Sequence, residues 1–228
     1  MEDSNPMHRK ERAFFSLPTT LKVRFLLYAF FSLFHRTLNL CLHLFNISRM
    51  KISGIQYGRN FKTEGIIIID IYPESEVVIG NDVSIISDSR RATSAALAFP
   101  AKFKTFSKTS RIIIGDSVGL NGTSITARSR TIHIGAGTII APNVIVVDSD
   151  FHIPWPPEQR RYYPGDEHDH DVLIGNNCWI GMNSVILKGV HIGENSVIAA
   201  GSIVTSDIPE NSLAAGVPAK VVKVYKSV

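Results

Sequence analysis

The stretch IGNNCWIGMNSVILKGVHIGENSVIAAGSIV, residues 174–204, decides the fold. An aliphatic residue stands at every sixth position, and a glycine directly follows three of these aliphatic residues. A strict period of six matches neither the 3.6 of a helix nor the 2 of a strand. It predicts one short strand and one turn per repeat, so that three repeats form one triangular coil of a parallel β-helix. The residues four places after each aliphatic are suited to tight corners: Cys178, Ser184, Val190, Ser196 and Ser202.

The same phase recurs upstream with irregular spacing. Ile79 and Ile114 are 35 residues apart, which is close to two coils of 18, and Ile114 and Ile134 are 20 apart. Ile134 and Ile174 are 40 apart, one coil with 22 residues to spare. The surplus falls in residues 148–171, which are rich in Pro, Tyr, His and Asp. A long loop on a regular solenoid is usually functional, so we expect the chemistry there.

Composition agrees with one solenoid domain. Of 228 residues, 44% are hydrophobic and 19% charged, as in ordinary globular proteins. The net charge of +4 comes from scattered basic residues, which argues against nucleic acid and favours anionic small molecules or an anionic membrane surface. The only cysteines, Cys41 and Cys178, lie far apart, which indicates a reduced, cytoplasmic protein. We divide the chain into a helical, amphipathic segment (1–50), an all-β solenoid of about seven coils (51–209) and a tail (210–228).

The first fifty residues differ in kind. Residues 21–47 are rich in Leu and Phe, contain no Gly or Pro, and predict a helix. The longest apolar run, 25–34, is too short for a membrane span of about 20 residues, and no cleavage site of a signal peptide is present. Two interpretations stay open: an amphipathic helix lying on the cytoplasmic membrane face, or a helix packed over the open end of the solenoid. The basic residues around it are Arg9, Lys10, Arg12, Lys22, Arg24, Arg36, Arg49 and Lys51.

The run DVLIGNNCWIGMNSVILKGV from Asp171, together with AAGVPAK ending at Lys220, resembles the hexapeptide-repeat acyltransferases. Within them it is most similar to the galactoside, maltose and nodulation acetyltransferases, including sugar O-acetyltransferases of surface-polysaccharide clusters. The resemblance covers residues 54–222 and implies a left-handed parallel β-helix, an exception to the usual right-handed crossover. It also implies a homotrimer with acetyl-CoA bound between neighbouring subunits.

The resemblance places the catalytic histidine at the start of the interrupting loop, which here is His152 in the sequence Asp148-Ser-Asp-Phe-His. A neutral imidazole can remove the proton of a sugar hydroxyl during attack on a thioester, and histidine is largely neutral near pH 7. Asp148 or Asp150 would orient the ring, and the sequence does not choose between them. The alternative is a solvated loop histidine with no catalytic role.

The resemblance also assigns binding residues. Asn121 matches an acceptor-binding asparagine whose amide could hold a sugar hydroxyl, although an internal asparagine ladder or a turn would equally explain it. Lys220 could reach a phosphate of coenzyme A or face solvent, and Thr205-Ser206 departs from the Thr-Lys of several relatives. The residues at or beside family positions for coenzyme A are Trp179, Gly181, Ala200, Thr205, Ser206 and Lys220.

A metal site, a purely structural solenoid and a different acetyl acceptor are the competing functions. A metal site at His168 and His170 is disfavoured, because the spacing of zinc-binding β-helix enzymes is absent, and we predict no metal. A purely structural solenoid would have no reason to interrupt its repeat with a histidine-bearing loop. We therefore predict an acetyl-CoA-dependent acetyltransferase acting on a sugar hydroxyl of a surface polysaccharide, lipid-linked sugar or nucleotide sugar. The alternative enzyme transfers acetyl to an amino sugar or a small xenobiotic.

Overall fold

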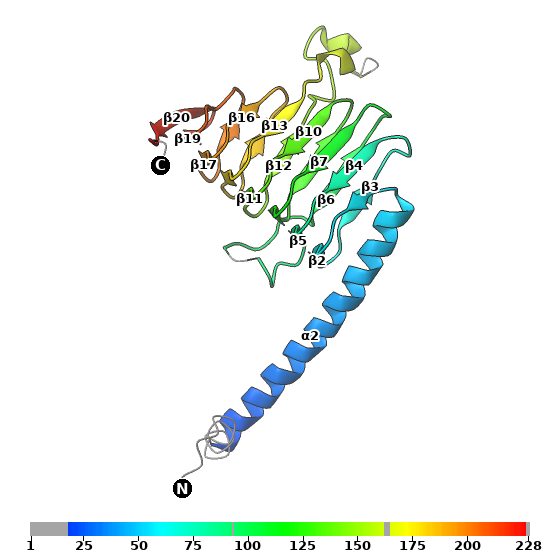
Figure 1. Ribbon diagram of the computed structural model, residues 1–228, viewed down its shortest axis with the longest axis vertical. Coiled ribbons are helices and arrows are strands. Elements are labelled where there is room, and N and C mark those ends of the chain that lie inside the picture. The colour runs from blue at the N-terminus through cyan, green and yellow to red at the C-terminus, as the bar shows by residue number, and fades with distance from the viewer. Residues whose placement is uncertain (1–17, 93, 162–164, 227–228) are drawn as a thin grey trace. The chain divides into compact units, whose positions relative to one another are not determined.

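The structure is a computed structural model that describes residues 18–92, 94–161 and 165–226. Three sheets, parallel except for one pair at the end of the second, form the faces of a solenoid (Figure 1). The first contains β1 (Gln56–Tyr57), β4 (Glu76–Ile79), β7 (Arg111–Ile114), β10 (Thr131–Ile134), β13 (Val172–Ile174) and β16 (His191–Ile192). The second contains β2 (Lys62–Glu64), β5 (Ser84–Ile86), β8 (Gly119–Asn121), β11 (Ile139–Ile140), β14 (Trp179–Ile180), β17 (Val197–Ile198), β19 (Ser212–Gly216) and β20 (Ala219–Val224). The third contains β3 (Ile68–Asp70), β6 (Lys102–Thr105), β9 (Ser124–Ala127), β12 (Ile145–Val147), β15 (Val185–Ile186) and β18 (Ile203–Val204).

The period of six sets the register. Ile134 pairs with Ile174 and Ile174 with Ile192, so equivalent aliphatic residues stack from coil to coil. All three side chains are fully buried, and the core is one continuous column of such residues. Among the described residues there are six complete coils, and Ile208 with β19 begins a seventh. The antiparallel strand β20 then ends the second sheet, so residues 210–226 continue the solenoid as a hairpin.

The spacing between Ile79 and Ile114 was misread from the sequence. These residues are direct partners in adjacent strands, so 35 residues make one coil and not two. The surplus forms a second loop between β5 and β6, around residues 87–101. Its backbone is tied to a later coil, since Ala98 N–H donates to Asn143 Oδ1 at 2.8 Å. Total length alone could not separate two regular coils from one coil with an insertion.

Asparagines make the corners of the coils. Asn177, Asn183 and Asn195 have positive φ angles of 55°, 57° and 58°, a left-handed conformation that asparagine tolerates better than most residues. Their side chains also link coils, as Asn195 Nδ2 donates to Asn211 Oδ1 at 3.0 Å. Gly135 meets a tighter constraint, because a Cβ there would lie 2.5 Å from the carbonyl carbon of Gly175 in the next coil. The repeated Ile-Gly pair is therefore a packing requirement of adjacent coils.

The last turns of α2 (Thr19–Ile52) cover the first coil. Asn46 is fully buried, and its amide donates to Thr63 Oγ1 at 3.1 Å and to the Gly65 carbonyl at 2.8 Å. Ile67 N–H donates back to Asn46 Oδ1 at 3.3 Å, and Arg49 donates to the Ile67 carbonyl at 2.8 Å. These side chains bind backbone groups at the sheet edges that face no preceding coil, so this end of the helix acts as a cap.

The remainder of α2 belongs to a separate compact unit, Met1–Cys41. Thr19–Ile52 is long and apolar enough to cross a membrane by length and composition, with an 18-residue window of mean hydropathy 1.3. The sequence argument against a span rests on the run 25–34 alone, which Ser32 interrupts. The helix continues past His35 and Arg36, so the length argument against a span does not hold.

Candidate active site

The loop that interrupts the repeats leaves the solenoid after β12 and returns at β13, where the sequence placed it. It contains two short 3₁₀ helices, η1 (Pro157–Gln159) and η2 (Asp166–His168). Because β12 and β13 belong to the regular coils, both ends of the loop are fixed. The loop can therefore carry irregular structure without disturbing the core.

Asp148 fixes the first end of the loop. Its carboxylate accepts hydrogen bonds from the backbone N–H groups of Arg128 (2.7 Å), Ser129 (3.0 Å) and Arg130 (2.8 Å). The side chain is completely buried, and this burial raises the pKa of the Asp148 carboxyl above its ordinary value even though the three donors oppose the shift. Asp148 is thus the anchor of the turn at residues 128–130.

Two further aspartates fix the other end of the loop to the same turn. The buried Asp169 accepts a hydrogen bond from Ser129 Oγ at 2.7 Å, and its carbonyl accepts one from Arg130 Nε at 3.1 Å. Asp171 Oδ1 accepts from the N–H of Thr131 at 2.8 Å. Both ends of the loop are thereby clamped to one turn of the preceding coil.

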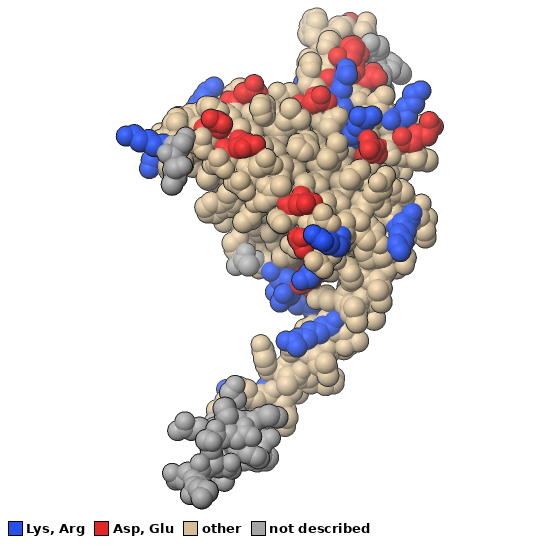
Figure 2. All heavy atoms as spheres, in the orientation of Figure 1, with Lys and Arg blue, Asp and Glu red and all other residues tan. Residues whose placement is uncertain are grey.

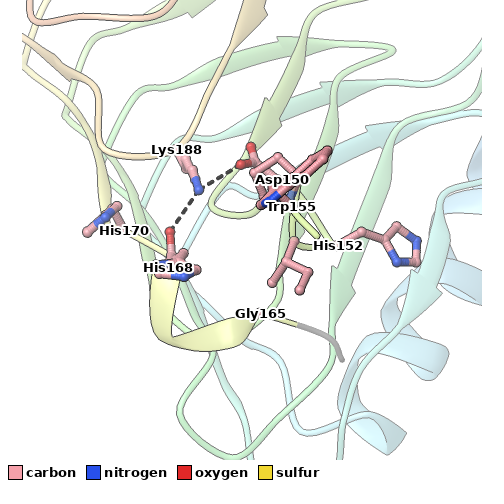
Figure 3. Close-up of a pocket in the computed structure, with 9 residues that line it drawn as sticks. Asp150, His152, Trp155, Gly165, His168, His170 and Lys188 are labelled. Carbon is pink, nitrogen blue, oxygen red and sulfur yellow. Dashed lines mark hydrogen bonds and ion pairs between the residues drawn. The ribbon is translucent and has the colours of Figure 1, made fainter. Parts of the chain in front are cut away.

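His152 is held by a backbone carbonyl. Its Nδ1 lies 2.9 Å from the carbonyl oxygen of Arg160. A carbonyl can only accept, so Nδ1 carries the hydrogen, and Nε2 keeps its lone pair when the ring is neutral. The ring is exposed, and Figure 3 shows it directed away from Lys188, His168 and His170. The arrangement leaves a proton acceptor facing outward from the loop.

The expected orienting carboxylate is not observed. Asp148 is occupied by backbone donors, and Asp150 Oδ2 forms an ion pair with Lys188 Nζ at 2.7 Å. The structure pairs neither aspartate with His152; the Arg160 carbonyl takes that place. A backbone carbonyl eight residues away leaves no mark in a residue pattern, so the sequence could not have identified it.

Lys188 was also missed. Its ammonium group bridges Asp150 and the His168 carbonyl, the latter at 2.9 Å, and so joins the two sides of the loop (Figure 3). The register could have found it: Val146 pairs with Ile186, so Lys188 lies one coil beyond Asp148. Lys188, Asp150 and His168 line a cavity of about 280 Å³ together with His152, Trp155 and His170.

Asn121 lies on β8 and faces the next coil. Its Nδ2 donates to the Ile140 carbonyl at 3.1 Å, as in an internal ladder. Its Oδ1 is buried and has no hydrogen-bond partner in the described structure. The amide nitrogen therefore has a structural role, as the alternative interpretation of Asn121 expects.

One cofactor candidate, Gly181, lies in a column of small residues. Ile180, Ile198 and Ala214 are register partners, so the residues after them, Gly181, Ala199 and Ala215, follow one another along the coil axis. Ala215 in turn pairs with Lys220, which is exposed.

Gly181 also has a role that needs no ligand, since a Cβ there would lie 2.5 Å from the N of Ala200. Trp179 projects from β14 with 57% of its surface exposed. Ala200, Thr205 and Ser206 are exposed at corners.

The histidines do not gather around a metal position. No group of three His, Cys, Asp or Glu side chains in the described part of the chain is placed to hold an ion. His168 Nε2 lies 3.4 Å from Glu167 Oε1, and His133 and His191 are separated by Leu173 across three adjacent strands.

Comparison with known proteins identifies the repeat. Residues 171–206 match the family model described as bacterial transferase hexapeptide (six repeats). Residues 171–206 carry repeats of this hexapeptide type. The resemblance found in the sequence is thereby confirmed, and the Ile-Gly column of the solenoid is the structural form of these repeats.

Among relatives of this hexapeptide-repeat chain, galactoside O-acetyltransferase of Escherichia coli (strain K12) is 44% identical over 118 residues, 52% of this chain and 56% of that protein. The provisionally named lipopolysaccharide biosynthesis O-acetyl transferase WbbJ of the same strain is 34% identical over 126 residues, 50% of this chain and 61% of that protein. The matches thus cover little more than half the length of these curated relatives. A mutant of AntD, an N-acyltransferase from Bacillus cereus, in complex with coenzyme A and dTDP-4-amino-4,6-dideoxyglucose, shares the fold. It has a TM-score of 0.58 and 21% identity, over 79% of this chain and 89% of that one.

Proposed function

We propose that this protein is an acetyl-CoA-dependent O-acetyltransferase acting on a hydroxyl of a surface polysaccharide, lipid-linked sugar or nucleotide sugar. The observation that carries the proposal is the state of His152, whose Nδ1 is engaged by the Arg160 carbonyl while Nε2 faces outward as a base. The names of the two Escherichia coli relatives support the reaction class. The proposal includes the left-handed coil sense of hexapeptide-repeat proteins.

The chain supplies the proton transfers of this reaction. Acetyl-CoA brings the acetyl group as a thioester. His152 Nε2 takes the proton of the acceptor hydroxyl as the oxygen attacks, and the imidazolium then gives that proton to the departing thiolate. The Arg160 carbonyl keeps the ring in the required tautomer and stabilises its positive form through the Nδ1–H hydrogen bond.

The column Gly181, Ala199 and Ala215 is suited to a long, amide-bearing arm. Its small side chains would let such an arm lie close to the coils, with Ala199 and Ala215 half-buried, and Lys220 at its end can meet a phosphate. Trp179, Ala200, Thr205 and Ser206 are exposed beside this column or at the corners that follow. These residues would hold acetyl-CoA.

We expect purified protein to release free thiol from acetyl-CoA only when a sugar acceptor is present. The measurement is thiol release with a panel of free, nucleotide-linked and lipid-linked sugars, followed by mass analysis of the product. An ester product confirms the proposal. Turnover confined to amino sugars, with an amide product, would replace it by N-acetyl transfer, and absence of thiol release with every acceptor class would contradict it.

We also expect three chains per particle. Ile139 and Trp179 are register partners on adjacent strands and are 56% and 57% exposed, an apolar patch suited to a neighbouring subunit. Light scattering of the full chain at micromolar concentration, with the contribution of detergent subtracted, should give three times the mass of one chain. A single-chain mass with full activity would remove the shared site from the proposal.

A further inference from the structure

The helix α2 exposes large apolar side chains along residues 25–34. Leu26, Leu27, Tyr28, Phe30, Phe31 and Leu33 are between 51% and 74% exposed. Figure 2 shows this part of the surface in the colour of uncharged residues, with few Lys or Arg atoms. Large apolar groups exposed in this density mark an interaction surface.

These side chains do not form a single stripe. Successive residues of an α-helix point about 100° apart, so the three exposed residues Leu26, Leu27 and Tyr28 already face three directions. A helix that is hydrophobic on all sides is buried in a large core or in a membrane. A single protein groove would cover only one side of it.

The charges around the run select the kind of partner. The helix contains Lys22, Arg24, Arg36, Arg49 and Lys51 and no acidic residue. Lys22 and Arg24 stand immediately before the apolar run, and Arg36 stands just after it. Such basic residues at the borders of an apolar segment suit the anionic headgroups of a lipid surface.

We propose that α2 anchors the protein to an anionic bilayer, with residues 25–34 entering one leaflet. Thr19–Ile52 is long enough to span, but a span would place Arg36 inside the hydrocarbon, where a charged side chain is costly. The run 25–34, about 15 Å long, therefore stays within one leaflet. Arg24 and Arg36 flank this run, and their long side chains can reach the headgroups of the same leaflet. The later turns cannot enter the lipid, because Asn46 is buried against the first coil.

The test is flotation of the full chain with vesicles of phosphatidylcholine alone and of phosphatidylcholine mixed with phosphatidylglycerol. Wild-type protein should float with the mixed vesicles, and the double variant Leu27→Glu/Phe31→Glu should lose at least about tenfold in affinity. The matched control is Val222→Glu/Val224→Glu, two residues of β20 that are 65% and 63% exposed, and it should float like the wild type. Lys22→Gln/Arg24→Gln should weaken binding to the mixed vesicles by about fivefold per charge.

A second measurement follows insertion directly. The Phe30→Trp variant has one tryptophan more than the wild type. The fluorescence of this additional tryptophan should be quenched by lipids with brominated acyl chains. Wild-type protein that floats with neither vesicle, or added fluorescence that stays unquenched on bound protein, would overturn the proposal. The proposal would also be overturned if the lipid-free protein formed assemblies that the Leu27→Glu/Phe31→Glu substitutions dissociate and that vesicles do not disrupt. The exposed run would then bind a second copy of the chain. Protein retained on vesicles after an alkaline wash would overturn entry into one leaflet.

Discussion

Replacing His152 by alanine should lower turnover about 10²–10⁴-fold, the usual contribution of a positioned general base. The loss follows because alanine removes the outward-facing Nε2 that would take the proton of the acceptor hydroxyl. The fold and the affinity for acetyl-CoA should hardly change, since the ring is exposed and bonds only to the Arg160 carbonyl. Thiol release gives the turnover, and isothermal titration gives the affinity for acetyl-CoA.

The controls lie in the same loop. His168→Ala and His170→Ala should each cost far less, because His168 takes part in the loop mainly through its backbone carbonyl and η2. Asp150→Asn should also cost little, since its carboxylate contacts Lys188 rather than the histidine. Wild-type turnover of His152→Ala on an accepted sugar would show that the loop is not the catalytic centre.

The sequence was most informative where one residue type repeats at a fixed interval. The Ile-Gly spacing predicted three faces, the stacking partners and the position of the loop at 148–171, because each coil must present an aliphatic residue to the same column. It failed between Ile79 and Ile114, where an insertion had nearly the length of a coil. A period identifies coils only when every strand of the coil is itself recognised.

The site was predictable only in part. Placement of His152 on the protruding loop followed from the break in the period and the family resemblance. The partner of its ring did not, because a carbonyl belongs to every residue and the fold of an irregular loop decides which carbonyl comes near. The aspartates were visible in the sequence, but their roles depend on burial: Asp148 lies under the loop, whereas Asp150 lies at the surface beside Lys188.

The helix shows a similar limit. The sequence offered a cap or a membrane segment as alternatives for residues 21–47. In the structure the last turns supply the cap through Asn46 and Arg49, while residues 25–34 remain apolar and exposed. One continuous helix can serve both purposes because Asn46 and Arg49, which bind the first coil, lie in its last turns, while the exposed run 25–34 lies in its first half.

Replacing Asp148 by alanine should destabilise the protein by about 3–5 kcal/mol, even though it changes one side chain outside the aliphatic core. The substitution leaves the N–H groups of Arg128, Ser129 and Arg130 without their acceptor, and an unsatisfied buried donor costs about 1–3 kcal/mol. The free energy of unfolding, from urea denaturation followed by circular dichroism, measures the effect. Loss of activity should accompany it, since the loop carrying His152 loses its first anchor.

The matched control is Asp150→Ala, two residues along the same loop. Its carboxylate is about half exposed and pairs with Lys188, and an exposed ion pair contributes at most about 1 kcal/mol to stability.

The variant Asp148→Asn tests the role of the charge on this carboxyl. Burial raises the pKa of Asp148 in the folded state, so the carboxyl's contribution to stability is full below its unfolded pKa of about 4 and is lost as pH rises through the folded pKa. Asparagine has no such titration, and the variant's stability should fall less with rising pH than that of the wild type. Equal losses in Asp148→Ala and Asp150→Ala would show that the three backbone hydrogen bonds do not hold the loop.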